Sequence, residues 1–279
     1  MPFVFYWKGI KLTLMKKRIQ ISVLLIFALF ITSKAQNLRT IHQTAFKAGE
    51  KLEFTASYGF VDAARVSLII QDSTKKIGSR QAFHVVGKGV SLGAFNWFFK
   101  VNDRYETYID DQAIIPWVFI RRVQEGGYTL KRNIYFNQYN NKAIVKSIKD
   151  GAKTTYVAEP NAQDLLSALY YARTLDLQNA KVGDEFTIPT FFDQENYPMK
   201  IKFLGKEVVK TALGKTNCLK FSPLLQEGRV FKEKEDMTIW ISDDQNKVPI
   251  RLKTNLLIGS LKLDLEKYSG LMAPLNLVK

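Results

Sequence analysis

A strand–turn–strand pattern that occurs twice constrains the fold of this chain more than any other sequence feature. The first copy, YIDDQAIIPWVF, spans residues 108–119, and the second, WISDDQNKVPIR, spans residues 240–251. Paired Asp residues favour a turn and the apolar runs on both sides favour strands, so each copy predicts a β-hairpin. In both copies a proline opens the second strand. The residues that we assign to the two turns as structural elements are Asp110, Asp111, Pro116, Asp243, Asp244 and Pro249.

Other turn signals repeat at nearly the same sequence separation as these two turns. The matching pairs are Gly49 with Gly183, Gly78 with Gly214, and Gly127 with Gly259. Together with the paired Asp residues they make four matches in the same order, which favours an internal duplication over chance recurrence of turn chemistry. We therefore predict two similar halves, at about residues 47–158 and 182–268.

Alternation of apolar and polar residues predicts the fold class. In the last expected strand Leu261, Leu263 and Leu265 alternate with charged residues, which gives one buried face and one wet face. Short segments of this kind recur along both halves. The sequence therefore predicts an all-β, antiparallel protein, in which two meander halves form a curved sheet or barrel-like body.

One segment has the period of a helix instead. At about residues 162–174, Leu165, Ala168, Leu169 and Ala172 follow the i, i+3, i+4, i+7 spacing of an amphipathic helix. Asn161 is expected to be the N-cap of this helix. We predict that the helix joins the two halves and packs its Leu/Ala face on a sheet.

Residues 1–35 have the composition of a secretory signal peptide. Basic residues after Met15 precede an apolar run at 19–32, and Ser33 and Ala35 suit a cleavage site after Ala35. Met15 is the expected true start, because residues 1–14 resemble an over-extended start. The apolar run is short for a membrane span, which needs about 20 residues, although an uncleaved anchor is the alternative. We expect one exported β-domain at 36–279, without a transmembrane span, in the periplasm or at the outer membrane.

Charge and cysteine content limit the partners and the means of stabilisation. Six of the 41 Lys and Arg lie in residues 1–35, which hold no acids, so the rest carries 35 basic and 26 acidic residues. This excess favours an anionic envelope component over nucleic acid, although scattered basic residues also suit a solvated surface. Cys218 is the only cysteine. It is expected to be a buried thiol, so an apolar core must hold the fold.

No sequence motif predicts catalysis, a metal site or a cofactor. His42 and His84 lie in no recognisable catalytic pattern, and no His/Cys cluster is present. The paired Asp residues lack the spacing of a calcium loop. We expect Asp243→Ala and Asp244→Ala to cost about 1 kcal/mol each and to leave ligand binding unchanged. The protein is therefore not expected to be an enzyme, and a carboxylate-dependent hydrolase is the weakest alternative.

Aromatic residues offer the strongest indication of a ligand site. They exceed what one face of a thin sheet needs, which indicates either a filled core or an apolar cavity for a lipid-like ligand. The candidate ligand-binding residues are Phe95, Trp97, Phe98, Phe99, Trp117 and Phe119.

Three segments resemble one known family. They are residues 46–52 (FKAGEKL), residues 164–173 (DLLSALYYAR), and residues 240–244 (WISDD) with Pro249 and Ile250. Together they are similar to the exported bacterial domain-of-unknown-function family 3108. The resemblance implies an all-β envelope protein and supplies no catalytic residues. The strand–turn–strand pattern is also similar, at fold level, to half-barrel carriers of lipid-linked cargo.

These observations lead to a functional hypothesis and one rival from another class. We expect a non-enzymatic envelope protein that binds an apolar or anionic component, such as a lipid-like ligand. The main alternative is a scaffold or assembly partner that acts through exposed edge strands. A filled interior would favour the scaffold, and an apolar cavity would favour the binding protein.

Overall fold

The structure is a computed structural model that describes residues 37–224, 237–255 and 259–278. The predicted signal peptide and its cleavage site therefore lie outside the described residues. The strands are β1 Lys51–Tyr58, β2 Val61–Ile70, β3 Lys75–Ile77, β4 Arg80–Ser91, β5 Asn102–Asp110, β6 Pro116–Glu125, β7 Tyr128–Asn137, β8 Lys142–Ser147, β9 Lys153–Val157, β10 Glu185–Phe192, β11 Glu195–Thr211, β12 Gly214–Leu224, β13 Met237–Ser242, β14 Pro249–Asn255 and β15 Ser260–Ser269. The helices are α2 Phe95–Phe98 and α3 Leu165–Ala172.

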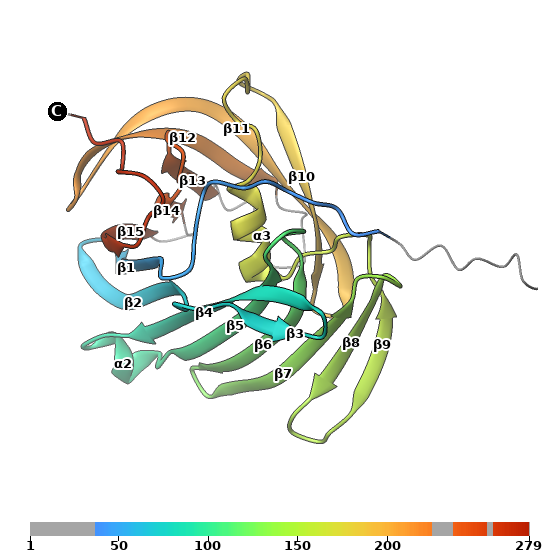
Figure 1. The fold of residues 1–279 in the computed structure, drawn as a ribbon. Helices are drawn as coiled ribbons and strands as arrows, with labels where there is room; N and C mark the ends of the chain where they lie inside the picture. The colour runs from blue at the N-terminus through green and yellow to red at the C-terminus, as the bar shows by residue number, and fades with distance from the viewer. Residues whose placement is uncertain (1–36, 225–236, 256–258, 279) are drawn as a thin grey trace, which may run out of the picture. The chain divides into compact units, whose positions relative to one another are not determined.

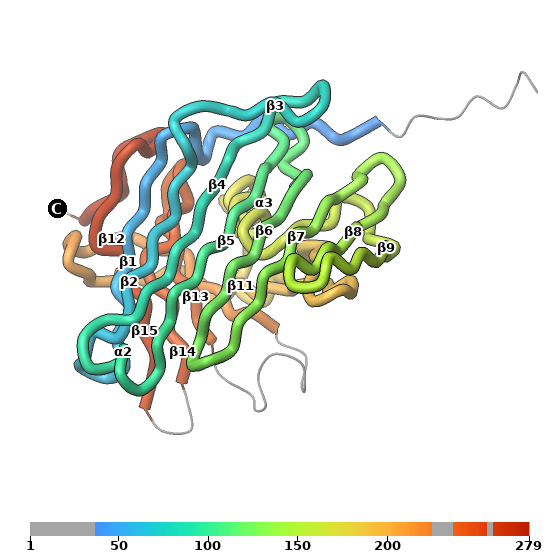
Figure 2. The backbone as a smooth tube through the Cα atoms, turned by 90° about the horizontal axis from the view of Figure 1, so that it is seen from below, coloured from blue at the N-terminus to red at the C-terminus, as the bar shows by residue number. Residues whose placement is uncertain are grey.

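All fifteen strands belong to one sheet. The hydrogen-bonded order is β10-β11-β12-β13-β14-β15-β1-β2-β4-β5-β6-β7-β8-β9, with β3 paired to β4 beside this path. Every named strand pair is antiparallel, and the first strand of the described chain lies next to the last one. The sheet curls around α3, as Figure 1 shows from one end and Figure 2 from below. The predicted all-β, antiparallel, barrel-like fold is confirmed.

The sheet contains two meanders with the same internal order. One runs through β10 to β15, and the other through β1, β2, β4, β5, β6 and β7, with β8 and β9 added to its end. Register shifts fall at the equivalent places, between Tyr108 and Ile109 in one meander and between Trp240 and Ile241 in the other. β15 joins the meanders by pairing with β1. Their origin in a duplication stays a prediction.

β11 is one long strand, Glu195–Thr211, although Gly205 interrupts its apolar–polar pattern. It continues because a register shift between Phe203 and Gly205 absorbs the irregularity. Gly205 has a positive φ of 118°, which a side chain would disfavour. The connection from β4 to β5 contains the short helix α2.

The helix α3 is shorter than expected and has a different cap. Asn161 was predicted as the N-cap, but Asp164 occupies that position. The reason is that Gln163 pairs with the edge strand β10: its N–H donates to the Pro189 carbonyl at 2.8 Å, and its carbonyl accepts from Phe191 N at 2.8 Å. A residue held in this extended bridge cannot begin a helix.

The edge strands β9 and β10 approach each other without pairing as strands. Asn196, at the start of β11, accepts from Glu159 N at 2.8 Å and donates to the Val157 carbonyl at 3.0 Å. Asp193, in the β10–β11 turn, accepts from Arg121 on β6 at 2.7 Å. These contacts bring the two ends of the sheet together and complete the enclosure around α3.

The core lies between α3 and the concave face of the sheet. Leu166 packs against three separate clusters of buried apolar side chains, centred on β1 with β14, on β6 with β7, and on β4 with β5. A Cβ on Gly87 would lie 3.3 Å from Leu166 Cδ2. This glycine therefore allows the close approach of helix and sheet.

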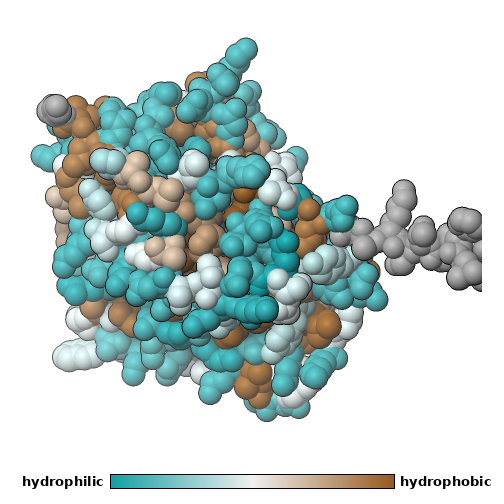
Figure 3. Space-filling model, in the orientation of Figure 1, coloured by the Kyte–Doolittle hydropathy of each residue, from teal (hydrophilic) through white to brown (hydrophobic). Residues whose placement is uncertain are grey.

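One face of the molecule is mainly polar. In Figure 3 hydrophilic residues cover most of the face seen in Figure 1, and apolar residues form separate patches. Within the described part of the chain, neither helix is long and apolar enough to cross a membrane.

Candidate functional site

An apolar groove lies between α3 and the concave face of strands β10 to β13. We call this site the helix groove. Its lining is formed by apolar side chains: Leu165, Ala168, Leu169, Ala172, Leu177, Ile188, Met199, Ile201, Phe221, Ile239 and Ile241. None of these residues was singled out as a ligand-binding residue from the sequence.

The periodicities of helix and strand together produce this lining. Leu165, Ala168, Leu169 and Ala172 share one face of α3, because they follow the 3.6-residue period. On the strands, alternate residues face the same side, which brings pairs such as Ile239 and Ile241 to the concave face. The apolar face of α3, which was expected to pack against a sheet, therefore faces the sheet across a cavity.

The size of the helix groove limits its occupant. Its volume is about 190 Å³, below the roughly 300 Å³ at which ligand pockets usually begin. Leu177 and Ile188 are buried at its base, whereas Leu165 is 37% exposed. The groove is therefore suited to a narrow apolar segment, such as part of an alkyl chain, that enters past Leu165.

Arg173 fastens the C-terminal end of α3 to three other segments. Its guanidinium forms a bidentate ion pair with Glu50 at 2.6 and 2.7 Å, and both side chains are buried. It also donates to the carbonyls of Asn246 and Ala45, each at 2.9 Å. Because an unpaired buried charge costs several kcal/mol, these bonds fix the position of the helix beside the groove.

Asp164 fastens the N-terminal end of α3. Its carboxylate accepts from the N–H groups of Leu166 and Ser167 at 2.8 and 2.9 Å, and from the Thr107 hydroxyl at 2.5 Å. Burial raises the pKa of Asp164 to about 6 despite these hydrogen bonds, because no basic side chain offsets its charge. The helix is thus capped by a carboxyl group that titrates near neutral pH.

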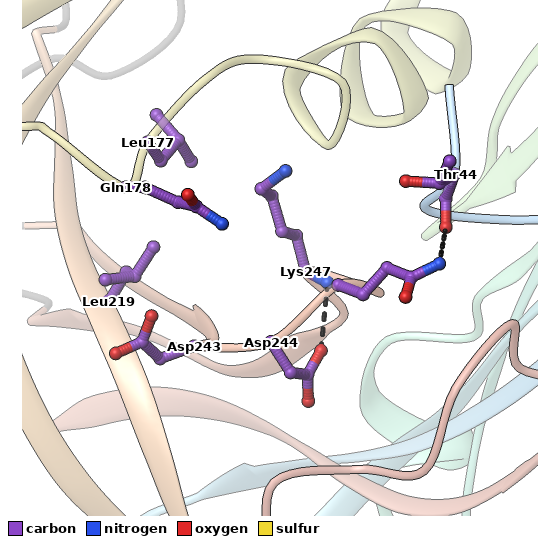
Figure 4. A pocket seen from close by; sticks show the side chains of 8 residues that line it. Thr44, Leu177, Gln178, Leu219, Asp243, Asp244 and Lys247 are labelled. Atoms are coloured by element: carbon purple, nitrogen blue, oxygen red, sulfur yellow. Dashed lines mark hydrogen bonds between the residues drawn. The ribbon is translucent and has the colours of Figure 1, made fainter. Parts of the chain in front are cut away.

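A second pocket lies at the Asp243–Lys247 turn and is shown in Figure 4. Its volume is about 450 Å³, and Leu177 lines both this pocket and the helix groove. Lys247 projects into it, and burial lowers the pKa of its ammonium group. Among the described residues no acceptor lies within hydrogen-bond distance of that group. We call this site the turn pocket; it places a polar space next to an apolar one.

The two predicted turns form, with different surroundings. Asp110 is fully buried, where Arg80 donates to it at 2.6 and 2.7 Å and Trp117 Nε1 donates at 3.1 Å. The first turn ends at Pro116, where β6 begins. Asp111 lies beside Asp110, and its pKa is raised by burial and by that neighbouring charge.

In the second turn, Asp243 and Asp244 line the turn pocket, and β14 begins at Pro249. Asp243 forms an ion pair with Lys206 at 2.7 Å. Asp244 accepts from the N–H groups of Asn246 at 2.9 Å and Lys247 at 3.2 Å. Both carboxylates are thus engaged within the protein.

The six aromatic residues predicted to bind a ligand do not come together. Phe119 is buried in the core, and Trp117 is buried at the first turn. The other four lie in or next to α2, where Trp97 and Phe98 are 88% and 85% exposed and Phe99 also faces solvent, while Phe95 is half-buried. Neither the helix groove nor the turn pocket contains any of these residues: Phe95, Trp97, Phe98, Phe99, Trp117 and Phe119.

One histidine has a partner that the sequence did not reveal. His84 Nε2 lies 2.7 Å from Glu106 Oε2, and Arg104 Nε donates to the other carboxylate oxygen, Oε1, at 2.7 Å. The pairing of β4 with β5 brings these residues together from positions 22 apart in sequence. Across the described residues, no group of three or more His, Cys, Asp or Glu side chains is placed to hold a metal ion.

Comparison with solved structures gives a similar fold with a TM-score above 0.5, and two further matches with lower TM-scores, all at low sequence identity. A β-barrel-like protein of the unknown-function domain DUF1849 from Brucella abortus has a TM-score of 0.51 and 7% identity, covering 84% of this chain and 99% of its own. A candidate lipoprotein from Parabacteroides distasonis has a TM-score of 0.35 and 12% identity, covering 84% and 100%. A candidate exported protein with a YmcC-like fold from Bacteroides fragilis has a TM-score of 0.31 and 13% identity, covering 83% and 99%.

Sequence comparison agrees with the resemblance noted from the three segments. No curated protein matches the chain. The family model described as a protein of unknown function, DUF3108, matches residues 53–266, which include both meanders, α3 and the helix groove. The chain belongs to the DUF3108 family.

Proposed function

We propose that this protein is an exported, non-enzymatic binding protein for a lipid-like molecule, whose apolar segment occupies the helix groove. The observation that carries this proposal is the groove itself, a cavity of about 190 Å³ lined throughout by apolar side chains. Burying apolar surface in such a site is favourable by about 25 cal/mol per Å². The signal peptide predicted at residues 1–35 supports an envelope location, in the periplasm or at the outer membrane.

The turn pocket provides a place for the polar end of the same ligand. Leu177 separates the two sites and lines both, and Lys247 supplies an ammonium group without an acceptor among the described residues. An amphipathic ligand with a carboxylate or phosphate would place its chain in the helix groove and its anionic group beside Lys247. This arrangement predicts weaker binding of an uncharged ligand with the same chain.

Filling the helix groove tests the proposal. The delipidated protein is titrated with a dansylated fatty acid, whose fluorescence rises on transfer to an apolar site. Ala172→Phe places a ring in the groove and is expected to weaken binding at least tenfold. The matched control is Ala152→Phe at the exposed β8–β9 turn, which leaves binding unchanged. Absence of binding by the wild type, or equal affinity in the Ala172→Phe variant, contradicts the proposal.

A scaffold role is the second candidate, because β9 ends the sheet with mostly exposed side chains and Val157 is 75% exposed. A partner strand added to this edge would complete its hydrogen bonds. Such a partner would bind the Ala172→Phe variant as well as the wild type. The same substitution therefore separates the two candidate functions.

A further inference from the structure

Five exposed aromatic side chains lie at one end of the sheet, and we call them the aromatic tip. Their exposed fractions run from 52% for Phe99 to full exposure for Phe60. The five residues are Phe60, Trp97, Phe98, Phe99 and Tyr128. They lie outside the helix groove and the turn pocket, so a role in either site does not explain them.

Three successive turns at the same end of the sheet bring these residues together. The turns join β1 to β2, β4 to β5, and β6 to β7, which are neighbours in the strand order. Val101 bridges to Glu125, and Gly126 N donates to the Lys100 carbonyl at 3.0 Å, so the second and third turns touch. Figure 2 shows α2 at this end of the sheet.

Two rings hold the aromatic tip in place: that of the half-buried neighbour Phe95 and that of Phe99, the least exposed member of the tip. The Phe95 ring meets the Tyr58 ring edge to face at a centroid distance of 6.3 Å. The Phe99 ring lies on Gly126, where a Cβ would come within 2.4 Å of it. With these two rings fixed, Trp97 and Phe98 project away from the protein. Their exposure follows from the geometry of the turn.

Three backbone N–H groups in and beside the tip are paired within the protein. The N–H groups of Asn96, Trp97 and Phe99 donate to carbonyls of the same turn at 3.2, 3.1 and 2.8 Å. The Asn96 side chain accepts from the Ser91 hydroxyl at 2.8 Å. A segment whose polar groups are paired internally can enter an apolar boundary without losing hydrogen bonds to water.

The charges around the aromatic tip indicate which boundary it would enter. The turn at residues 92–101 carries Lys100 and no acidic residue, and Lys100 is exposed. Two acids flank the neighbouring turns: Asp62 is exposed and accepts from the Ser57 hydroxyl at 3.0 Å, and Glu125 lies half-buried beside Asp103. Trp and Phe next to Lys match the aromatic and basic residues that proteins place at membrane interfaces.

We propose that the aromatic tip docks this protein on the surface of an anionic phospholipid bilayer, with Trp97 and Phe98 inserted at the boundary between headgroups and acyl chains. Lys100 then lies among the anionic headgroups. This role is independent of the ligand in the helix groove, since the two sites share no residue. It brings the protein to a surface on which lipid-like molecules are present.

Tryptophan fluorescence gives a direct test with vesicles of equal parts phosphatidylcholine and phosphatidylglycerol. Among the described residues Trp97 is exposed, whereas Trp117 and Trp240 are buried, so a shift of emission to shorter wavelength on vesicle addition reports Trp97. The protein is expected to sediment with these vesicles, and with vesicles of phosphatidylcholine alone about fivefold more weakly, because Lys100 is the one basic residue of this turn. Added salt is expected to reduce binding.

Two variants of the tip and one control distinguish insertion from other contacts. The Trp97→Ala/Phe98→Ser variant is expected to lose vesicle binding at least tenfold with an unchanged unfolding midpoint, because both side chains are exposed. Trp97→Phe keeps most of the binding and loses the emission shift. Val182→Ser removes an apolar side chain that is 73% exposed elsewhere and leaves binding unchanged.

Three outcomes would overturn the proposal: no vesicle binding by the wild type, equal binding by the Trp97→Ala/Phe98→Ser variant, or self-association through the tip without vesicle binding. The Ala172→Phe variant, which fills the helix groove, is expected to dock normally. Failure of docking and failure of the proposed ligand binding are therefore distinguishable.

Discussion

The two Asp-Asp-Gln turns have similar backbones but different side-chain hydrogen bonds. In both, a register shift precedes the turn and a residue with positive φ lies two positions before the proline: Ile114 at 50° and Lys247 at 47°. In the first turn Asp110 alone accepts from two backbone N–H groups, from Arg80 and from Trp117. The second turn has neither of these side-chain donors.

In the second turn two residues share the contacts that Asp110 makes in the first. Ser242 Oγ accepts from Val248 N at 2.9 Å, and Asp244 accepts from backbone N–H groups within the turn and from Asn276 N at 3.0 Å. The Asp110 side chain is fully buried, whereas Asp243 and Asp244 are half-buried and line the turn pocket. One hairpin frame thus holds a buried carboxylate that anchors the turn in one meander and two partly exposed carboxylates in the other.

The largest expected loss of stability concerns the first turn. Asp110→Ala leaves Arg80 and Trp117 Nε1 without their acceptor and is expected to lower the free energy of unfolding by about 3 kcal/mol. Urea denaturation measures this loss. Asp111→Ala is the matched control and should cost much less, because burial and Asp110 already disfavour its charge. Equal losses in the two variants would contradict the assignment of Asp110 as the anchor.

Asp164 and Asp110 are expected to change the stability of the protein with pH in opposite directions. Burial alone would raise the pKa of Asp110, but hydrogen bonds from Arg80 and from the turn's N–H groups hold it below its usual range. The stabilisation from Asp110 is therefore lost as pH falls below about 4.

The pKa of Asp164 shifts in the opposite direction on folding: it is about 6 in the folded state, above the value of about 3.9 in the unfolded chain. The folded protein then binds more protons, and stability falls as pH rises from about 4 to 6, by about 3 kcal/mol in total.

Urea denaturation of the wild type and of Asp164→Asn at pH 4 and pH 7 checks this prediction. An asparagine can cap the helix without titrating, so the variant should gain stability relative to the wild type as pH rises. A difference between the two proteins that is constant with pH would show that the Asp164 carboxyl group does not titrate in this window.

The next largest loss of stability is expected in the second turn. Asp244 is the acceptor for the N–H groups of Asn246, Lys247 and Asn276. Its replacement in Asp244→Ala is expected to cost about 2 kcal/mol. This exceeds the loss of about 1 kcal/mol expected from the sequence, because the carboxylate also ties the C-terminal segment to the turn.

A double variant sharpens this prediction, because Ser242 Oγ donates to Asp244 at 2.8 Å. The Ser242→Ala/Asp244→Ala variant should lose less stability than the sum of the single losses, since the two side chains share one set of contacts. Urea denaturation of the three variants measures the coupling. Additive losses would refute the cooperation of the two residues.

The smallest effect is expected at Asp243. Its partner Lys206 has an exposed side chain, and ion pairs of this kind contribute little because water screens them. Asp243→Ala should change the free energy of unfolding, measured by the same urea denaturation, by less than about 0.5 kcal/mol. A loss as large as that of Asp244→Ala would remove the distinction between the two carboxylates.

The sequence predicted the fold well because the fold depends on local patterns. Alternation identified the strands, and the helical period identified α3. The N-cap was wrong because a long-range bond, from Gln163 to β10, decides where the helix begins. The helix groove was missed for a related reason: its strand residues come from four strands whose register fixes which side chains face α3.

The aromatic residues show the limit of composition as a guide. Phe119 and Trp117 fill the interior, whereas Trp97 and Phe98 face solvent on a turn that the sequence does not distinguish from a strand entry. Their exposure depends on Gly126, which belongs to a different turn and makes room for the Phe99 ring. Residue type alone therefore could not separate core from surface.

The pairing of β1 with β15 has a consequence for how this chain reaches its native state. Lys51 pairs with Ser269 and Tyr58 with Leu261, so the middle of the sheet forms between the two most distant strands of the fold. As the chain emerges in order, β1 has a neighbour on one side and an open edge on the other until the last strand arrives. Contacts of such long sequence separation slow folding and leave a strand edge free to pair wrongly. Protection of that edge during synthesis is therefore a requirement that follows from the strand order.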